Sequence, residues 1–121
     1  MNLAIFSQLA EREYQAVLKD TPDYPYSLDE VLDIFCTFFE QYAKHRGEQH
    51  PHLKRELIRK YIQLMPCRSE AGGENAYYDV CKYKDIIRHY FSSTLKNCDY
   101  HIGHFFSGDI RIFREYEIMY E

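Results

Sequence analysis

The sequence lacks the features that would assign it to a membrane or to a familiar class of enzyme. No stretch of its 121 residues approaches the roughly 20 apolar residues needed to span a bilayer, and its opening has no basic start like that of a secretory signal. We therefore expect a soluble, cytoplasmic protein with no membrane partner. It contains no glycine-rich phosphate loop, serine elbow or paired-carboxylate motif, and Gly72-Gly73 alone predicts a turn. These absences predict a protein that is not an enzyme and has no cofactor or small-molecule ligand.

Cysteine is present but lacks the spacing of a redox or zinc motif. None of the four cysteines lies in a C-x-x-C pair, so we expect free thiols. The best metal candidate is Cys98-x-x-His101-x-x-His104, whose spacing of three residues drifts around a helix instead of converging on one tetrahedral site. We favour buried cysteine and hydrogen-bonded histidine over zinc, and a small enzyme or zinc-binding protein is the third function considered.

Apolar residues recur at helical spacing along most of the chain, which predicts an all-α fold of five to six short helices in one domain over 1–121. The clearest local signal is Ser27-x-x-Glu30, a capping box that starts a helix at residue 28, with Gly47 as its stop. Pro51 opens the next helix, in which Leu64 is expected to face inward. The predicted helices are 3–19, 28–46, 52–65, 77–95, a short one ending at 106, and 110–116.

The segment 66–76, with its two glycines, is predicted to be a mobile loop. Gly103 and Gly108 argue against a continuous helix in the tail, and a short C-terminal hairpin is the alternative there.

Charge is divided unevenly along the chain. Residues 1–43 carry two basic and eight acidic side chains, residues 44–68 carry seven and two, and residues 69–121 carry six and nine. Opposed surface potentials of this kind steer encounters with partners and say little about fold. The pattern therefore favours a protein that works by binding a macromolecule.

The basic segment supplies the first candidate binding residues. At 100° per residue, Arg55, Arg59 and Gln63 form one ridge of the predicted helix. Arg suits guanine and Gln suits adenine, so nucleic-acid binding is the alternative function; a solvated helix face explains the same pattern. The basic candidates are Lys54, Arg55, Arg59, Lys60 and Gln63.

Acidic and aromatic residues supply the second set. Asp33 and Glu40 lie in one sector of the helix 28–46, where they could face a basic surface or simply stabilise and solubilise the helix. The chain has twelve tyrosines, and those at predicted helix ends are expected at an exposed rim, where tyrosine often anchors an interface. Tyr24 and Tyr78 are the chosen anchors, with Tyr26, Tyr77, Tyr100 and Tyr120 as further members of the rim.

Two stretches, Tyr26 to Leu32 and Asn97 to Arg111, resemble those of short, uncharacterised bacterial proteins encoded in genomes and mobile elements. The resemblance implies no activity and assigns no residue a role. It implies the setting of a small accessory gene, whose helical product binds host proteins or nucleic acid. We therefore predict an accessory or inhibitor protein that docks on another protein, with inhibition of a host nucleic-acid enzyme as a special case.

Overall fold

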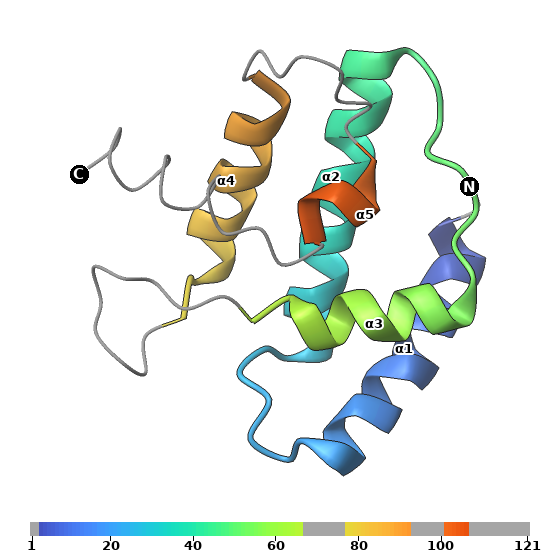
Figure 1. Cartoon of the computed structure of the whole chain (residues 1–121), viewed down its shortest axis with the longest axis vertical. Helices are drawn as coiled ribbons and strands as arrows, with labels where there is room; N and C mark the ends of the chain where they lie inside the picture. Colours follow the sequence, from blue (N-terminus) through green and yellow to red (C-terminus); the bar gives the residue numbers. More distant parts are fainter. Residues whose placement is uncertain (1–2, 67–76, 93–100, 107–121) are drawn as a thin grey trace.

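The computed structural model describes residues 3–66, 77–92 and 101–106, and this part of the chain forms five helices and no β-strand (Figure 1). The predicted all-α class is thereby confirmed. Except for Pro66, the predicted loop at 66–76 lies outside the described residues, as do the predicted helix 110–116 and the hairpin alternative. The helices are α1 (Leu3–Asp20), α2 (Leu28–Arg46), α3 (Arg55–Leu64), α4 (Val80–Ser92) and α5 (Ile102–Phe106).

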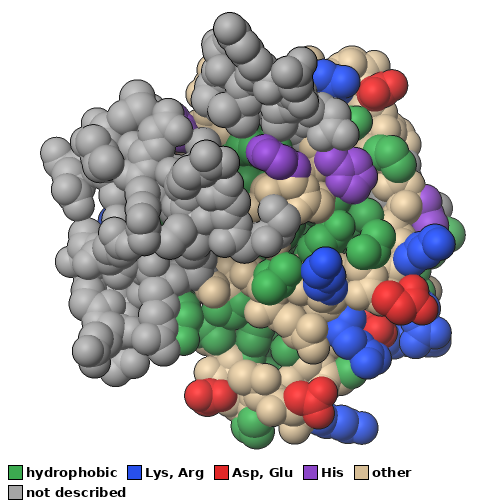
Figure 2. Space-filling model, in the orientation of Figure 1, with side chains coloured by type: hydrophobic (Ala, Val, Ile, Leu, Met, Phe, Trp, Pro, Cys, Tyr) green, Lys and Arg blue, Asp and Glu red, His purple; other side chains and the backbone are tan. Residues whose placement is uncertain are grey.

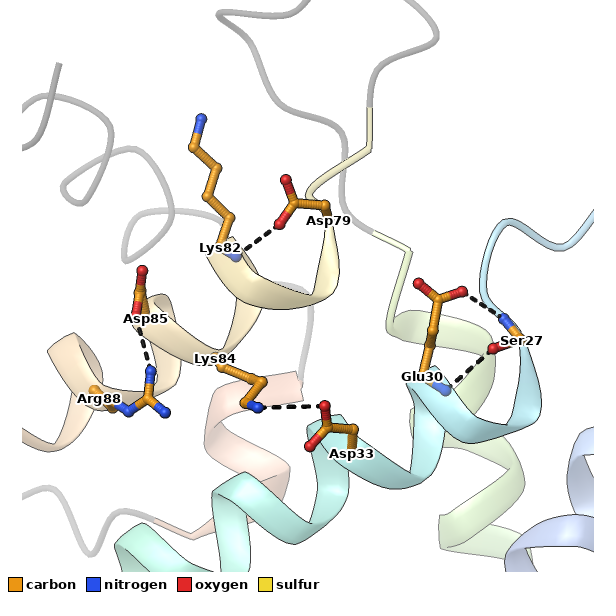
Figure 3. Close-up of polar contacts among 8 residues, drawn as sticks. All are labelled: Ser27, Glu30, Asp33, Asp79, Lys82, Lys84, Asp85 and Arg88. Atoms are coloured by element: carbon orange, nitrogen blue, oxygen red, sulfur yellow. Dashed lines mark hydrogen bonds and ion pairs between the residues drawn. The ribbon is translucent and has the colours of Figure 1, made fainter.

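Helix α2 begins and ends where the sequence predicts. The Glu30 backbone N–H donates to Ser27 Oγ at 3.2 Å, and the Ser27 N–H donates to Glu30 Oε1 at 3.0 Å (Figure 3). Gly47 ends the helix at φ 72°, a left-handed conformation that glycine adopts without steric cost, and its N–H donates to the Ala43 carbonyl. The two caps satisfy backbone groups that the helix itself leaves without partners.

The helices form two packed pairs, α1 with α3 and α2 with α4, and α5 packs against both pairs. Helices α2 and α4 lie side by side and α3 crosses over α1 (Figure 1). The short α5 contacts α3, and its two phenylalanine rings pack on Phe35 and Phe38 of α2. Gly103 allows α5 to approach α3 closely, because a Cβ atom there would lie 2.9 Å from the Tyr61 hydroxyl. The arrangement buries one apolar face of every helix against its neighbours.

Aromatic rings make up much of this core. Phe38 of α2 is fully buried at its centre, and most of its ring contacts have edge-to-face or tilted geometry, as aromatic pairs favour. Its neighbours come from three helices and the segment after α2. They are Phe39, His50, Tyr90, Phe91, Phe105 and Phe106.

Helix α3 begins three residues later than predicted. Lys54 is its N-cap in an extended conformation, and residues 49–53 before it form no regular secondary structure. Leu53 and His50 in this non-helical segment are buried, with 2% and 3% of their surfaces exposed. The prediction that Leu64 faces inward is also wrong, because Leu64 is 39% exposed and Ile62 takes the fully buried position.

Two other helix starts differ from the predictions. Helix α4 begins at Val80 instead of Tyr77, and Asp79 caps it by accepting the Lys82 N–H at 2.8 Å (Figure 3). The predicted end at residue 95 lies outside the described residues. Helix α1 matches its predicted range within one residue, and its first side chain, Leu3, is 49% exposed.

The predicted rim of exposed tyrosines is largely wrong. Tyr78 and Tyr26 are only 3% and 4% exposed, and Tyr24 is half-buried, whereas Tyr77 is exposed. Four tyrosine hydroxyls donate to backbone carbonyls near helix ends instead of facing a partner: Tyr14 to Tyr26, Tyr24 to Ile62, Tyr26 to Tyr78 and Tyr83 to Met65, at 2.6 to 2.8 Å. Tyr100 and Tyr120 lie outside the described residues.

Within the described ranges, none of the helices has the length and apolar character needed to cross a membrane.

Candidate docking site on helices α1 and α3

The predicted basic residues come together on one exposed face of α3. Arg55 and Arg59 are one helical turn apart, Lys60 follows, and Lys54 stands at the N-cap. The opposite face of α3 carries the buried Ile58, Tyr61 and Ile62. Because the apolar face packs inward, the cationic groups project outward beside α1.

A buried acidic residue of α1 holds the two arginines. The Glu13 side chain is only 4% exposed, and its Oε1 accepts a hydrogen bond from Arg59 Nε at 3.1 Å. Its other oxygen, Oε2, lies 3.7 Å from Arg55 Nη2. The arginine side chains themselves remain about half exposed, at 57% for Arg55 and 47% for Arg59. Glu13 therefore anchors the guanidinium groups from below and leaves their outer surfaces open to solvent.

An open depression of about 390 Å³ surrounds this arrangement. Such a volume lies at the lower end of the range of about 300–1,000 Å³ for ligand clefts. Figure 2 shows Lys and Arg side chains beside Asp and Glu side chains over the region where α3 crosses α1. The depression is lined by Glu13, Arg55, Glu56, Arg59, Lys60 and Gln63.

Glu13 is not among the residues predicted from the sequence, although the sequence contains a signal for it. It falls three residues after Ala10 and four before Val17, on the same face as the apolar residues of α1. A carboxylate at such a position is seldom buried unless it has a charged partner. The two basic residues of α3 supply that partner from 42 and 46 positions along the chain.

The predicted acidic stripe is exposed, but one member has an internal role. Asp33 of α2 accepts a hydrogen bond from Lys84 of α4 at 3.3 Å and so joins the two helices (Figure 3). Glu40, two turns further along α2, is exposed. The two carboxylates flank Cys36, a half-buried residue on the same side of the helix.

Cys36 also lines a smaller, mainly apolar hollow of about 190 Å³ between the start of α1 and the second half of α2. Burial raises the pKa of the Cys36 thiol, and the negative charges of Glu40 and Asp33 raise it further. Both effects keep the sulfur protonated and lower its nucleophilicity near neutral pH. The other residues of the hollow are Leu3, Phe39, Glu40, Ala43, Gln49 and His50.

We expect iodoacetamide at pH 8 to modify Cys36 several-fold more slowly than the exposed Cys81, because the raised pKa leaves less thiolate at Cys36. Peptide mass mapping over time measures both rates in the same sample. The variant Glu40→Gln should speed modification of Cys36 and leave that of Cys81 unchanged. Equal rates at the two cysteines would contradict the protected state of Cys36.

The histidines of the metal candidate make other contacts. The His101 Nδ1 accepts the Gly103 N–H at 3.0 Å and so caps α5, while His104 is exposed and shares a hydrogen bond of 2.8 Å with the Tyr90 hydroxyl. Cys98 lies outside the described residues. Among the residues that are described, no group of three His, Cys, Asp or Glu side chains is placed to hold a metal ion.

Comparisons with protein-family models, with curated proteins and with solved structures find no match for this chain.

Proposed function

We propose that this protein is a non-catalytic binding protein that docks on another protein through the basic face of α3. The observation that supports this proposal is the buried Glu13 carboxylate, which holds Arg55 and Arg59 at the edge of an open depression. Arginines anchored in this way lose less side-chain freedom on binding than arginines that move freely in solvent. Arginine is also one of the residues that most often dominate the energy of protein interfaces.

Nucleic-acid binding is the second candidate, favoured by the exposure of Arg55, Arg59 and Lys60 on α3 and of Lys54 at its N-cap. The acidic groups on that face argue for a protein partner instead. Helix α3 has ten residues and is therefore about 15 Å long, a length over which duplex DNA carries about nine negative charges. The four basic groups are offset by Glu13 and Glu56, which leaves a net charge of about +2. This charge would neutralise only about two of the nine phosphates.

Affinity capture with matched charge-reversal variants tests the proposal. The test variant is Lys54→Glu with Lys60→Glu, which keeps the Glu13 contacts; the control is Lys19→Glu with Lys82→Glu, on exposed positions of α1 and α4. We expect a protein retained by the wild type and the control to bind the test variant about tenfold more weakly in a titration with the purified partner. A tenfold loss is about 1.4 kcal/mol, or about 0.7 kcal/mol for each of the two lysines, which is within the range of exposed charge contacts.

Two results would contradict this function. One is the recovery of chaperones alone, and the other is equal retention by the test and control variants. Titration of labelled duplex and single-stranded DNA at two salt concentrations examines the second candidate, because binding to phosphates weakens steeply as salt rises.

A further inference from the structure

We infer that the depression between α1 and α3 binds a single carboxylate side chain from an acidic segment of the partner protein, with Glu13 as the residue that positions the arginines. This inference rests on the proposed docking function and adds the chemistry of the occupant.

The donors around the depression suit a carboxylate. Glu13 engages Arg59 through Nε, so the two terminal amino groups of that guanidinium have no acceptor among the described residues. Arg55 contacts Glu13 through Nη2 alone, at 3.7 Å, which leaves its other donors accessible. A guanidinium offers pairs of parallel N–H groups that match the two oxygens of a carboxylate. Lys60 adds an ammonium group and Gln63 an amide at the same opening.

The charge of the lining suits one carboxylate better than a row of phosphates. Arg55, Arg59 and Lys60 contribute three positive charges, and Glu13 and Glu56 contribute two negative ones. The remaining positive charge matches one ionised carboxyl group. The Glu56 carboxylate on the wall would repel further anionic groups of a nucleic-acid backbone, because like charges in close contact disfavour binding.

An exposed apolar side chain next to the depression offers a second contact, which a peptide could use. Leu64 lies one helical turn after Lys60 and is 39% exposed. An acidic segment that carries an apolar residue could place its carboxylate between the arginines and its apolar group on Leu64. Free inorganic phosphate or acetate lacks this second contact, so the occupant we infer is a peptide segment and not a small ion.

The experiment measures fluorescence anisotropy of a labelled peptide built from Glu and Leu, with a second peptide that has Gln in place of every Glu. We expect the Glu peptide to bind at least tenfold more tightly than the Gln peptide. Arg55→Gln and Lys60→Gln should each weaken binding about tenfold, whereas Lys82→Gln, which removes the same charge from α4, should leave it unchanged. Equal binding of both peptides, or an equal effect of the Lys60 and Lys82 variants, would overturn the inference.

Variants at Glu13 separate positioning from simple attraction. Removing this negative charge should strengthen anion binding if only the net charge matters. We expect the opposite for Glu13→Leu, a loss of about tenfold, because the arginines lose their anchor. Glu13→Gln keeps an acceptor for Arg59 and should bind at least as tightly as wild type. Tighter binding by Glu13→Leu would overturn the positioning role, and circular dichroism confirms that each variant is folded.

Two competitors identify other occupants. Labelled duplex DNA that binds more tightly than the Glu peptide would overturn the inference in favour of nucleic acid, and displacement of the peptide by equimolar inorganic phosphate would overturn it in favour of a small-anion site. If the peptide does not bind but capture of the partner still depends on Lys54 and Lys60, only this inference fails. If capture is also independent of these lysines, the proposed function fails with it.

Discussion

Phe38→Ala should lower the free energy of unfolding by about 3–5 kcal/mol, the range measured when a buried aromatic ring is truncated. The ring is fully buried and contacts residues of α4 and α5 as well as its own helix, so its removal opens a cavity where three helices meet. Urea denaturation followed by far-UV circular dichroism gives the change. For a domain of this size, the melting temperature should fall by 10 °C or more, at about 4 °C per kcal/mol.

The matched control is Ile5→Ala, because Ile5 is 53% exposed on the first turns of α1. That change should alter the free energy of unfolding by about 0.5 kcal/mol or less. If Phe38→Ala cost no more than Ile5→Ala, the aromatic cluster would not be the centre of the folded core.

The second large effect concerns the ion pair below the candidate site. Arg59→Gln should destabilise the fold by about 1–3 kcal/mol, because the buried Glu13 carboxylate loses its hydrogen bond and, among the described residues, keeps only Arg55 at 3.7 Å as a charged partner. The loss should stay below that of a fully buried pair, since the Arg59 side chain is 47% exposed and partly screened by solvent. Chemical denaturation of the purified variant measures it.

A double-mutant cycle assigns this loss to the pair itself. In a Glu13→Leu background, Arg59→Gln should have little effect, because the carboxylate that needs a partner is gone. Arg88→Gln is the surface control: Arg88 pairs with Asp85, and both side chains are about half exposed. We expect that change to cost less than about 1 kcal/mol. Additive effects of the Glu13 and Arg59 changes would mean that the contact contributes nothing to stability.

Helix positions could be read from the sequence wherever the signal was local. The capping box at Ser27 and Glu30 involves residues three apart, and both of its hydrogen bonds are present. The predicted start of α3 after Pro51 is three residues too early, because proline permits a helix start without requiring one. What delays the helix is the burial of Leu53 and His50 against distant helices, and no local pattern contains that information.

Only the part of the candidate site that lies within one helix could be predicted from the sequence. Helical spacing placed Arg55, Arg59 and Gln63 together on one face, and the structure gathers them around one depression. Glu13, which holds the two arginines, lies in another helix, and its role follows only from the packing of α1 against α3. The prediction for Tyr78 is wrong because its ring is 3% exposed, and its position before a helix does not tell whether the ring faces solvent or the core.

The tyrosine hydroxyls that reach backbone carbonyls also set an alkaline limit to the fold. Burial raises the pKa of Tyr24 and of Tyr14 above the usual value near 10, so both hydroxyls keep their protons in the folded chain after they would have lost them in the unfolded one. The folded state then binds more protons than the unfolded state, and its stability falls as pH rises beyond about 10. A phenolate could no longer donate to the Ile62 or Tyr26 carbonyl. Strong base should therefore separate α1 and α3 from the segment that joins α1 to α2.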